Sequence, residues 1–265
     1  MPALLSVATA TPPNRMGQAE RAHEVQSLFE GIADRYDQPA QAFGLLRYRA
    51  WHRQVAKRVA QARPQRVLDM CSGTGAIAAE VAARTSAVLV CADLTRGMLK
   101  QAVQRPTLAG RQVHFVQADA QAPPFPPQSF DVVAFSYLLR YVEDVEGTIA
   151  ALGALVRPGG LMVSLEFGVP EGRVARALWG FYVGTLLPAG LARLSPGWRR
   201  VGGFLGGSIR DFGQRWPIAR QETAWRAAGF ELDPTRRLSL GGGVLMSGTK
   251  AAPQEGPPHP EGAGA

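Results

Sequence analysis

An acid and two glycines between residues 66 and 76 are the part of the chain best suited to binding chemistry. The segment reads RVLDMCSGTGA: an apolar run containing Asp69 is followed by a turn with Gly73 and Gly75. Glycines let the backbone turn tightly and approach a ligand closely, and the helix that follows offers free amides. The pattern predicts a nucleoside-binding turn, with Cys71 standing where a third glycine is common.

A second acid, Asp93, ends the apolar run at 88–92, about 18 residues after the glycine turn. An acid in this position commonly accepts hydrogen bonds from both ribose hydroxyls. The alternative is an N-cap for the helix that carries Met98 and Leu99. Leu94, the next residue after Asp93, is expected at the same cofactor. Met98 is expected either against an adenine ring or in the core.

A third acid, Asp119, follows the apolar run at 113–117. It is suited to accept from an adenine amino group while the Ala120 amide donates to a ring nitrogen; the alternative is an aspartate that starts a turn. Ser136, at the end of the run 131–136, is expected at the same ligand. These residues complete the predicted cofactor site.

The glycine turn lacks the Gly-Lys-Ser/Thr of a phosphate-binding loop, which disfavours ATP and GTP. S-adenosyl-L-methionine carries no phosphate and presents an ammonium, a carboxylate and a sulfonium instead. Asp69 at the floor of the turn suits the cationic part of such a ligand, directly or through water. We therefore expect S-adenosylmethionine as the cofactor.

Apolar runs and helical stretches alternate along the chain, which predicts an α/β fold with a doubly wound, mostly parallel, seven-stranded Rossmann-like sheet. Strands are expected at 66–70, 88–92, 113–117, 131–136, 160–166, 230–237 and 243–249, the last two as a closing hairpin. Helices are expected at 20–36, 44–62, 76–84, 96–104, 144–156 and 217–228.

The domain is expected to span 21–249, with 171–212 as a helical cap insertion because this stretch is too long for a plain connection. Residues 1–20 are expected to form a flexible segment outside the fold. Residues 250–265, rich in Pro, Gly and Ala, are expected to form a disordered tail.

Composition limits the classes of function. Two cysteines make no disulfide framework, four scattered histidines make no metal site, and neither a signal peptide nor a transmembrane run is evident. A cytoplasmic protein is expected. The net charge of +8 is typical either of a solvated arginine-rich surface or of an anionic partner. With no RNA-binding module in the sequence, we expect no nucleic acid, and a negatively charged membrane face remains as the partner.

The succession of motifs resembles class I S-adenosylmethionine-dependent methyltransferases, and more closely the ubiquinone/menaquinone biosynthesis C-methyltransferase family. The resemblance covers about residues 26–249. It rests on these segments: FEGIADRYD (29–37), VLDMCSGTG (67–75), ADLTRGML (92–99), QADAQAPPFP (117–126), LRYV (139–142), RPGG (157–160), LEF (165–167) and SIR (208–210).

The resemblance implies methylation of a quinol ring carbon, in which the site stabilises a phenolate. Arg140 is implied in that role, because a guanidinium stays protonated and is no base; the alternative is an ion pair with Glu143 or Asp144. Tyr141, with Tyr137, is expected either to stack on the ring or to pack in the core. Glu166 is expected to be a proton acceptor or the partner of an arginine such as Arg210.

The chain departs from the family at three places. Ala76 replaces the usual Asp after the glycine turn, Tyr141 replaces the usual Asn, and the Asn usual a few residues after Tyr-Asp is absent from 38–42. These changes keep two alternatives open: an O- or N-methyltransferase for another small aromatic acceptor, and a catalytically idle subunit of a quinone-synthesis complex. Residues 4–20 also look like the opening of type III polyketide synthases, which would indicate a polyketide-derived acceptor.

The apolar segment 174–188 is expected to line a tunnel for a lipophilic acceptor through Trp179, Phe181, Tyr182 and Leu186. Alternatives are plain packing of a cap helix and peripheral contact with the inner face of a membrane. A homodimer is left open.

Overall fold

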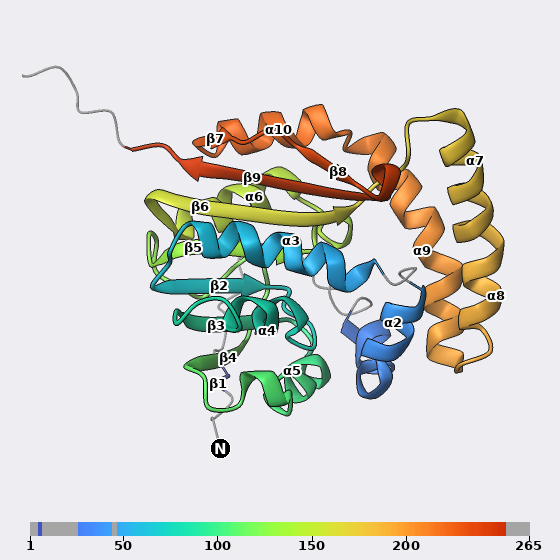
Figure 1. The fold of residues 1–265 in the computed structure, drawn as a ribbon, viewed down its shortest axis with the longest axis horizontal. Helices are drawn as coiled ribbons and strands as arrows, with labels where there is room; N and C mark the ends of the chain where they lie inside the picture. The colour runs from blue at the N-terminus through green and yellow to red at the C-terminus, as the bar shows by residue number, and fades with distance from the viewer. Residues whose placement is uncertain (1–4, 7–25, 44–46, 253–265) are drawn as a thin grey trace, which may run out of the picture.

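Residues 5–6, 26–43 and 47–252 are described by the computed structural model, shown in Figure 1. The central sheet follows the order β1-β4-β3-β2-β5-β6-β9-β7. Its parallel strands are β2 (Arg66–Met70), β3 (Val88–Asp93), β4 (Val113–Gln117), β5 (Phe130–Ser136) and β6 (Val156–Phe167). The reversal of strand order beside β2 is where doubly wound folds bind ligands, outside the carboxyl ends of the strands.

The antiparallel end of the sheet confirms the closing hairpin and refines it. Strand β9 (Gly243–Lys250) pairs with β6 on one side. On its other side it pairs with both β7 (Phe230–Leu232) and β8 (Arg236–Leu238), so the run expected at 230–237 is interrupted. Seven strand positions are therefore present as expected, one of them shared by two short strands.

One further strand lies at the opposite edge. Strand β1 (Leu5–Ser6) pairs in parallel with β4 through Leu5 and Val116. These two residues belong to the sheet, although the sequence placed all of residues 1–20 outside the fold. The remainder of that segment, and residues 253–265 of the expected tail, lie outside the described residues.

Helices cover both faces of the sheet because the strands bury side chains on both sides. Helices α3 (Tyr48–Gln61), α4 (Ala76–Ala82) and α5 (Arg96–Val103) pack on one face, with Val55 and Leu89 in their core. Helices α6 (Val145–Leu155) and α10 (Ile218–Ala227) cover the other face, where Trp225 is fully buried.

The region before α3 differs from the expected long helix at 20–36. Residues 26–30 are helical, followed by a short 3-10 turn, η1 (Ala33–Arg35), and by helix α2 (Asp37–Phe43). The chain is thus folded back on itself beside the carboxyl ends of the strands rather than running as one rod. We call residues 26–40 the N-terminal strap.

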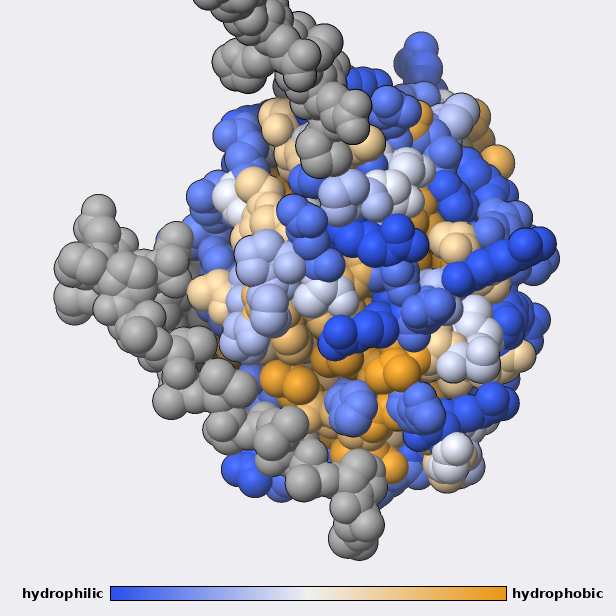
Figure 2. Space-filling view, turned by 90° about the vertical axis from the view of Figure 1, so that its left-hand side faces the viewer, coloured by the Kyte–Doolittle hydropathy of each residue, from blue (hydrophilic) through white to orange (hydrophobic). Residues whose placement is uncertain are grey.

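The cap insertion is helical, as expected. Helix α7 (Arg173–Phe181) continues through a π-helical turn, η4 (Tyr182–Leu186), into α8 (Leu187–Leu191), and α9 (Pro196–Arg215) returns beside it. Ser195 caps α9 by accepting from the Trp198 amide. In Figure 1 these helices form the outermost layer beyond the carboxyl ends of the strands. The opposite side, in Figure 2, is largely hydrophilic, with an apolar area in its lower middle.

Candidate active site

A cavity of about 1040 Å³ lies at the carboxyl ends of β2, β3, β4 and β5, beneath the strap. Most of the residues predicted for the cofactor and the chemistry line it: Cys71, Gly73, Asp93, Leu94, Met98, Asp119, Ala120, Ser136, Arg140 and Tyr141. Three predicted residues do not: Asp69, Gly75 and Glu166 lie behind the lining. Tertiary structure thus gathers residues spread over 70 positions of sequence, from Cys71 to Tyr141.

The glycine turn has the backbone conformation that its sequence predicts. Cys71, Gly73 and Gly75 all have positive φ, at 60°, 54° and 76°. A side chain at Gly75 would meet Leu108 and Ala102 at 3.1 and 3.2 Å, so Gly75 permits the close packing of α4 and α5. A side chain at Gly73 would meet no atom within 4 Å, so glycine serves there for its conformation and for an open approach to the cavity.

Asp93 ties the turn to the next strand. One carboxylate oxygen accepts from the Gly73 amide at 2.8 Å and the other from the Thr95 amide at 2.8 Å. The N-cap of α5 is Thr95, so the alternative expectation of Asp93 as the N-cap is wrong. The Thr95 side chain also hydrogen-bonds to this carboxylate, which lines the cavity wall where a ribose diol could bind. Burial raises the pKa of Asp93, while these amides lower it.

Asp69 lies beneath the turn and is 3% exposed. Its Oδ2 accepts from the Ala78 amide at 3.1 Å, and its Oδ1 has no hydrogen-bond partner among the described residues. Burial raises the pKa of Asp69 to about 7. Asp69 therefore stabilises the start of α4 and faces the ligand only through the turn above it.

The adenine end of the predicted site combines ligand-facing and structural contacts. Asp119 Oδ1 accepts from the Gln121 amide at 2.9 Å, so this aspartate does start a turn while also lining the cavity. Met98 lines the cavity and also belongs to the apolar cluster beneath the cap. Asp119 and Met98 thus each line the cavity and also have the structural role that was the alternative expectation: Asp119 starts a turn, and Met98 packs in an apolar cluster.

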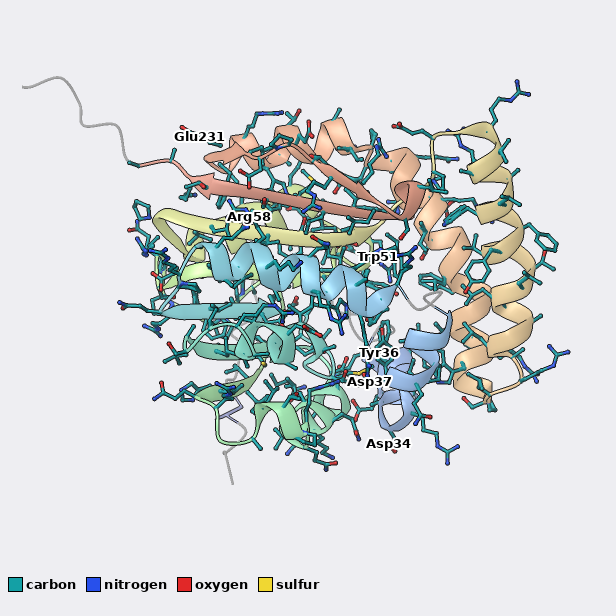
Figure 3. All side chains as sticks on the ribbon, viewed as in Figure 1. Asp34, Tyr36, Asp37, Trp51, Arg58 and Glu231 are labelled. Atoms are coloured by element: carbon teal, nitrogen blue, oxygen red, sulfur yellow. The ribbon has the colours of Figure 1, made fainter. Side chains whose placement is uncertain are left out.

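The strap is bonded to the glycine turn by an ionic cluster that sequence analysis missed. Asp37 accepts from the Thr74 hydroxyl at 2.5 Å and pairs with Arg105, and the Arg105 Nε donates to the Thr74 carbonyl at 2.7 Å. Farther along, Glu30 accepts from the Gly97 amide at 2.9 Å. Figure 3 shows Tyr36 and Asp37 at the junction of the strap and the sheet. The Tyr-Asp of the FEGIADRYD motif was the available signal.

A second cavity of about 1020 Å³ lies between the first cavity and the cap. Both cavities are lined by Phe29, Tyr36, Tyr48, Arg140, Tyr141 and Phe167, so they meet at these side chains. The cap contributes apolar walls from Trp179, Tyr182, Val183, Leu187 and Leu191. Of the four predicted tunnel residues, Trp179 and Tyr182 line this cavity, whereas Phe181 and Leu186 point to solvent at 58% and 51% exposure.

Arg140 stands where the two cavities meet and is 6% exposed. Its Nη2 donates to the Tyr141 hydroxyl at 2.8 Å, and its guanidinium lies 4.3 and 5.0 Å from the ring centroids of Tyr141 and Phe167. Its Nε and Nη1 have no hydrogen-bond partner among the described residues. Two buried donors thus remain for an anionic or polar group of a ligand.

Glu166 is the acid beside Arg140, rather than Glu143 or Asp144. Its Oε2 lies 3.7 Å from Arg140 Nη1, and its Oε1 accepts from the amides of Leu138 and Leu139 at 2.8 and 2.9 Å. Burial raises the pKa of Glu166 to about 7, although Arg140 and the amides lower it. Since Glu166 does not line either cavity, the structure favours the arginine-partner alternative, with Arg140 in place of Arg210.

Aromatic side chains form a wall next to Arg140; the sequence analysis named Tyr137 among them but not Tyr48 or His52. The Tyr137 ring stacks on Phe167 at 4.3 Å and on Tyr48 at 5.5 Å between centroids. His52 contacts Tyr48 at 4.1 Å, and burial lowers the pKa of His52 to about 4. These residues come from α3 and from the ends of β5 and β6, and only folding brings them together.

A parallel sheet closed by the antiparallel β9, with a glycine turn after β2 and an acid at the end of β3, has the Rossmann-like architecture of class I S-adenosylmethionine-dependent methyltransferases. The family model of the ubiE/COQ5 methyltransferase family matches residues 16–250. The chain belongs to this family and is a methyltransferase by that membership.

Individual comparisons agree. The chain is 32% identical over 248 residues to a demethylmenaquinone methyltransferase of Clavibacter sepedonicus, covering 93% of this chain and 98% of that one. A SAM-dependent methyltransferase structure from Thermotoga maritima shares the fold (TM-score 0.53, 14% identity, 84% of this chain and 99% of that one). So does the [4+2]-cyclase SpnF (TM-score 0.53, 16% identity, 76% and 81%), so fold alone does not fix the reaction.

Proposed function

We propose that this protein transfers a methyl group from S-adenosylmethionine to a ring carbon of a quinol or related phenolic lipid in quinone biosynthesis. The observation that carries the proposal is the meeting of two cavities at Arg140: one beside the glycine turn, with Asp93, Asp119 and Ser136 among its lining, the other apolar and beneath the cap. A relative named demethylmenaquinone methyltransferase supports the same class of acceptor.

The first cavity fits S-adenosylmethionine by its shape and donor set. Asp93 offers carboxylate oxygens for the ribose, Leu94, Met98, Asp119 and Ala120 surround the adenine, and the turn at Cys71–Gly73 with Ser136 receives the amino-acid end. When bound, the cofactor supplies an electrophilic methyl group on a sulfonium. The cavity residues would hold the cofactor beside the second cavity, and placement of this kind is worth roughly 7–11 kcal/mol.

Arg140 is proposed to stabilise the phenolate of the acceptor through Nε and Nη1, which make no hydrogen bond among the described residues. A ring carbon becomes nucleophilic when its neighbouring hydroxyl loses a proton, and a fixed guanidinium in a buried site stabilises the resulting charge. Methyl transfer forms a carbon–carbon bond, breaks a carbon–sulfur bond and ends with loss of the ring proton. We assign that proton to a water oriented by Arg140 Nε, which makes no hydrogen bond among the described residues, with Glu166 positioning Arg140.

The apolar second cavity suits the chain of a lipophilic acceptor. Its walls include Trp179, Val183, Leu187 and Leu191. Phe167, which lines both cavities and stacks on Tyr137 of the first, suits a flat ring where the cavities meet. Such an acceptor resides in a membrane, so we also propose a cytoplasmic protein that works at the inner membrane face. A homodimer stays a prediction without support from a described contact.

Three measurements test the proposal. Calorimetry should detect S-adenosylmethionine binding that is lost in Asp93→Ala, with Asp144→Ala as a control outside the cavity. NMR of the product of a short-chain quinol should locate the methyl group on carbon; a methyl group on oxygen would establish the O-methyltransferase alternative. Multiple turnovers by purified protein exclude an idle subunit, and the absence of cofactor binding by folded protein would overturn the proposal.

A further inference from the structure

The outer face of the cap exposes an apolar stripe that the fold does not use. On the continuous helix from α7 through α8, the side chains of Val174, Leu178, Phe181 and Leu186 are 74%, 66%, 58% and 51% exposed. Their spacing of three to five residues puts them on one side of the helix. Monomeric soluble proteins rarely leave contiguous apolar patches open unless something binds there.

The opposite side of the same helix is already occupied. Trp179, Val183, Leu187 and Leu191 recur every four residues and line the second cavity or pack toward α9. The helix therefore has two apolar stripes: an inner stripe that packs against the rest of the protein and an outer stripe that is exposed. Arg173–Leu191 has the length and composition to cross a membrane. Crossing it would, however, separate Trp179, Val183, Leu187 and Leu191 from their contacts within the protein. A helix lying flat on a surface keeps both stripes buried.

Charge indicates the nature of that surface. Residues 172–210 contain six arginines and no acidic residue: Arg173, Arg176, Arg193, Arg199, Arg200 and Arg210. Among the described residues, none of the six takes part in an ion pair. The segment thus supplies most of the net charge of +8, on the layer that is outermost in Figure 1. Arginines with no acid partner beside exposed apolar side chains fit anionic lipid headgroups above acyl chains.

We propose that the outer face of the cap, residues 173–204, docks on an anionic lipid bilayer. The proposal rests on the proposed function in one respect: a lipid-borne acceptor gives the docking its purpose. Phe204 and Leu194, 44% and 47% exposed on α9 and before it, extend the apolar surface. The second cavity is walled by the inner side of the docked helix, so a lipid acceptor has only the thickness of the cap to cross.

Vesicle co-sedimentation tests this docking directly. The full-length protein should bind vesicles of phosphatidylcholine with phosphatidylglycerol, at least about tenfold more strongly than pure phosphatidylcholine. The preference should shrink as salt rises, because exposed charges are screened. The triple variant L178S/F181S/L186S should lose binding to both vesicle types. The triple variant R193Q/R199Q/R200Q should lose only the preference for phosphatidylglycerol.

The controls separate docking from folding and from the proposed function. Leu240→Ser removes an 84% exposed side chain outside the cap, and Arg226→Gln removes an exposed arginine of α10; neither should alter vesicle binding. The cap variants should bind S-adenosylmethionine and methylate a water-soluble short-chain quinol as the parent does. Equal vesicle binding by the parent and the cap variants would overturn the docking. A cap variant that changes only the oligomeric state would also overturn it, because a second copy of the protein would then be what covers the cap. Vesicle binding without cofactor binding would contradict the proposed function and leave the docking proposal standing.

Discussion

Arg140 and Glu166 form a buried pair, 3.7 Å from Nη1 to Oε2, with side chains only 5% and 3% exposed. Glu166 is held by the amides of Leu138 and Leu139, which follow β5, while Arg140 is the next residue along. The acid at the end of β6 thus fixes the loop after β5 and the cation it carries. In this arrangement the buried guanidinium keeps two nitrogens, Nε and Nη1, without a hydrogen bond among the described residues.

Arg140→Ala should lower turnover by about 100-fold or more while leaving cofactor affinity within a few-fold, because the phenolate loses its donors. It should also lower the free energy of unfolding by about 3–5 kcal/mol, because Glu166 stays buried without its partner. Assays of methyl transfer measure the turnover, and chemical denaturation measures the free energy of unfolding. The double variant R140A/E166Q is the control: it should recover stability but not turnover, and recovery of turnover would contradict the assigned role.

Asp69 should make stability depend on pH. Its folded pKa is raised by burial to about 7, from 3.8, so between those values the native state binds more protons than the unfolded state. The free energy of unfolding should therefore fall as pH rises from about 4 to about 7, by roughly 1.4 kcal/mol for each pH unit in that window, and level off above it. Glu166, with a pKa of about 7, should contribute in the same direction.

Asp69→Asn removes this titration and keeps an acceptor for the Ala78 amide. Its unfolding free energy, measured by denaturation at pH 5, 6, 7 and 8, should decline less steeply than that of the parent. Parallel curves for parent and variant would show that Asp69 titrates as an ordinary carboxylate.

His52 should discriminate between cofactor analogues. It lines the first cavity with Thr74 and Ala76, is 3% exposed, and its Nε2 has no partner among the described residues. The residues after β2 face the amino-acid end of the cofactor if Asp93 binds the ribose. His52→Phe should then weaken binding of S-adenosylhomocysteine by about tenfold or more, the usual effect of losing a hydrogen bond to a charged group.

The matched ligand is 5′-methylthioadenosine, which lacks the amino-acid end. Calorimetry should find its affinity unchanged in His52→Phe and partly restored affinity for S-adenosylhomocysteine in His52→Gln. Equal losses for both ligands would indicate a general packing defect at α3.

Trp179→Ala should separate short acceptors from long ones. Trp179 lines the second cavity only, whereas Arg140 lines both cavities, so we expect the indole to contact the lipid chain of the acceptor rather than the reacting ring. The KM for a long-chain quinol in detergent should rise several-fold, and kinetics with a short-chain quinol should stay unchanged. A lower kcat for both acceptors would mean that Trp179 helps to position the ring.

Local sequence determined the fold class and the cofactor turn, because both depend on near neighbours in the chain. Alternation of apolar runs and helices follows from burial on both faces of the sheet, and Gly73 and Gly75 have the positive φ that their turn requires. The cap insertion could also be predicted, since a long Gly-, Leu- and Arg-rich stretch interrupts the alternation of strands and helices.

Tertiary structure decided which side chains meet. Arg140 and its partner Glu166 are 26 residues apart, and they meet because the carboxyl ends of neighbouring parallel strands lie at the same edge of the sheet. Asp37 of the strap pairs with Arg105, which is also distant in sequence. Which stripe of the cap helix faces the cavity was likewise open, since both stripes are apolar and only packing against α9 separates Trp179 from Phe181. Pairings across such distances depend on the burial and charge of the whole fold, which no local pattern encodes.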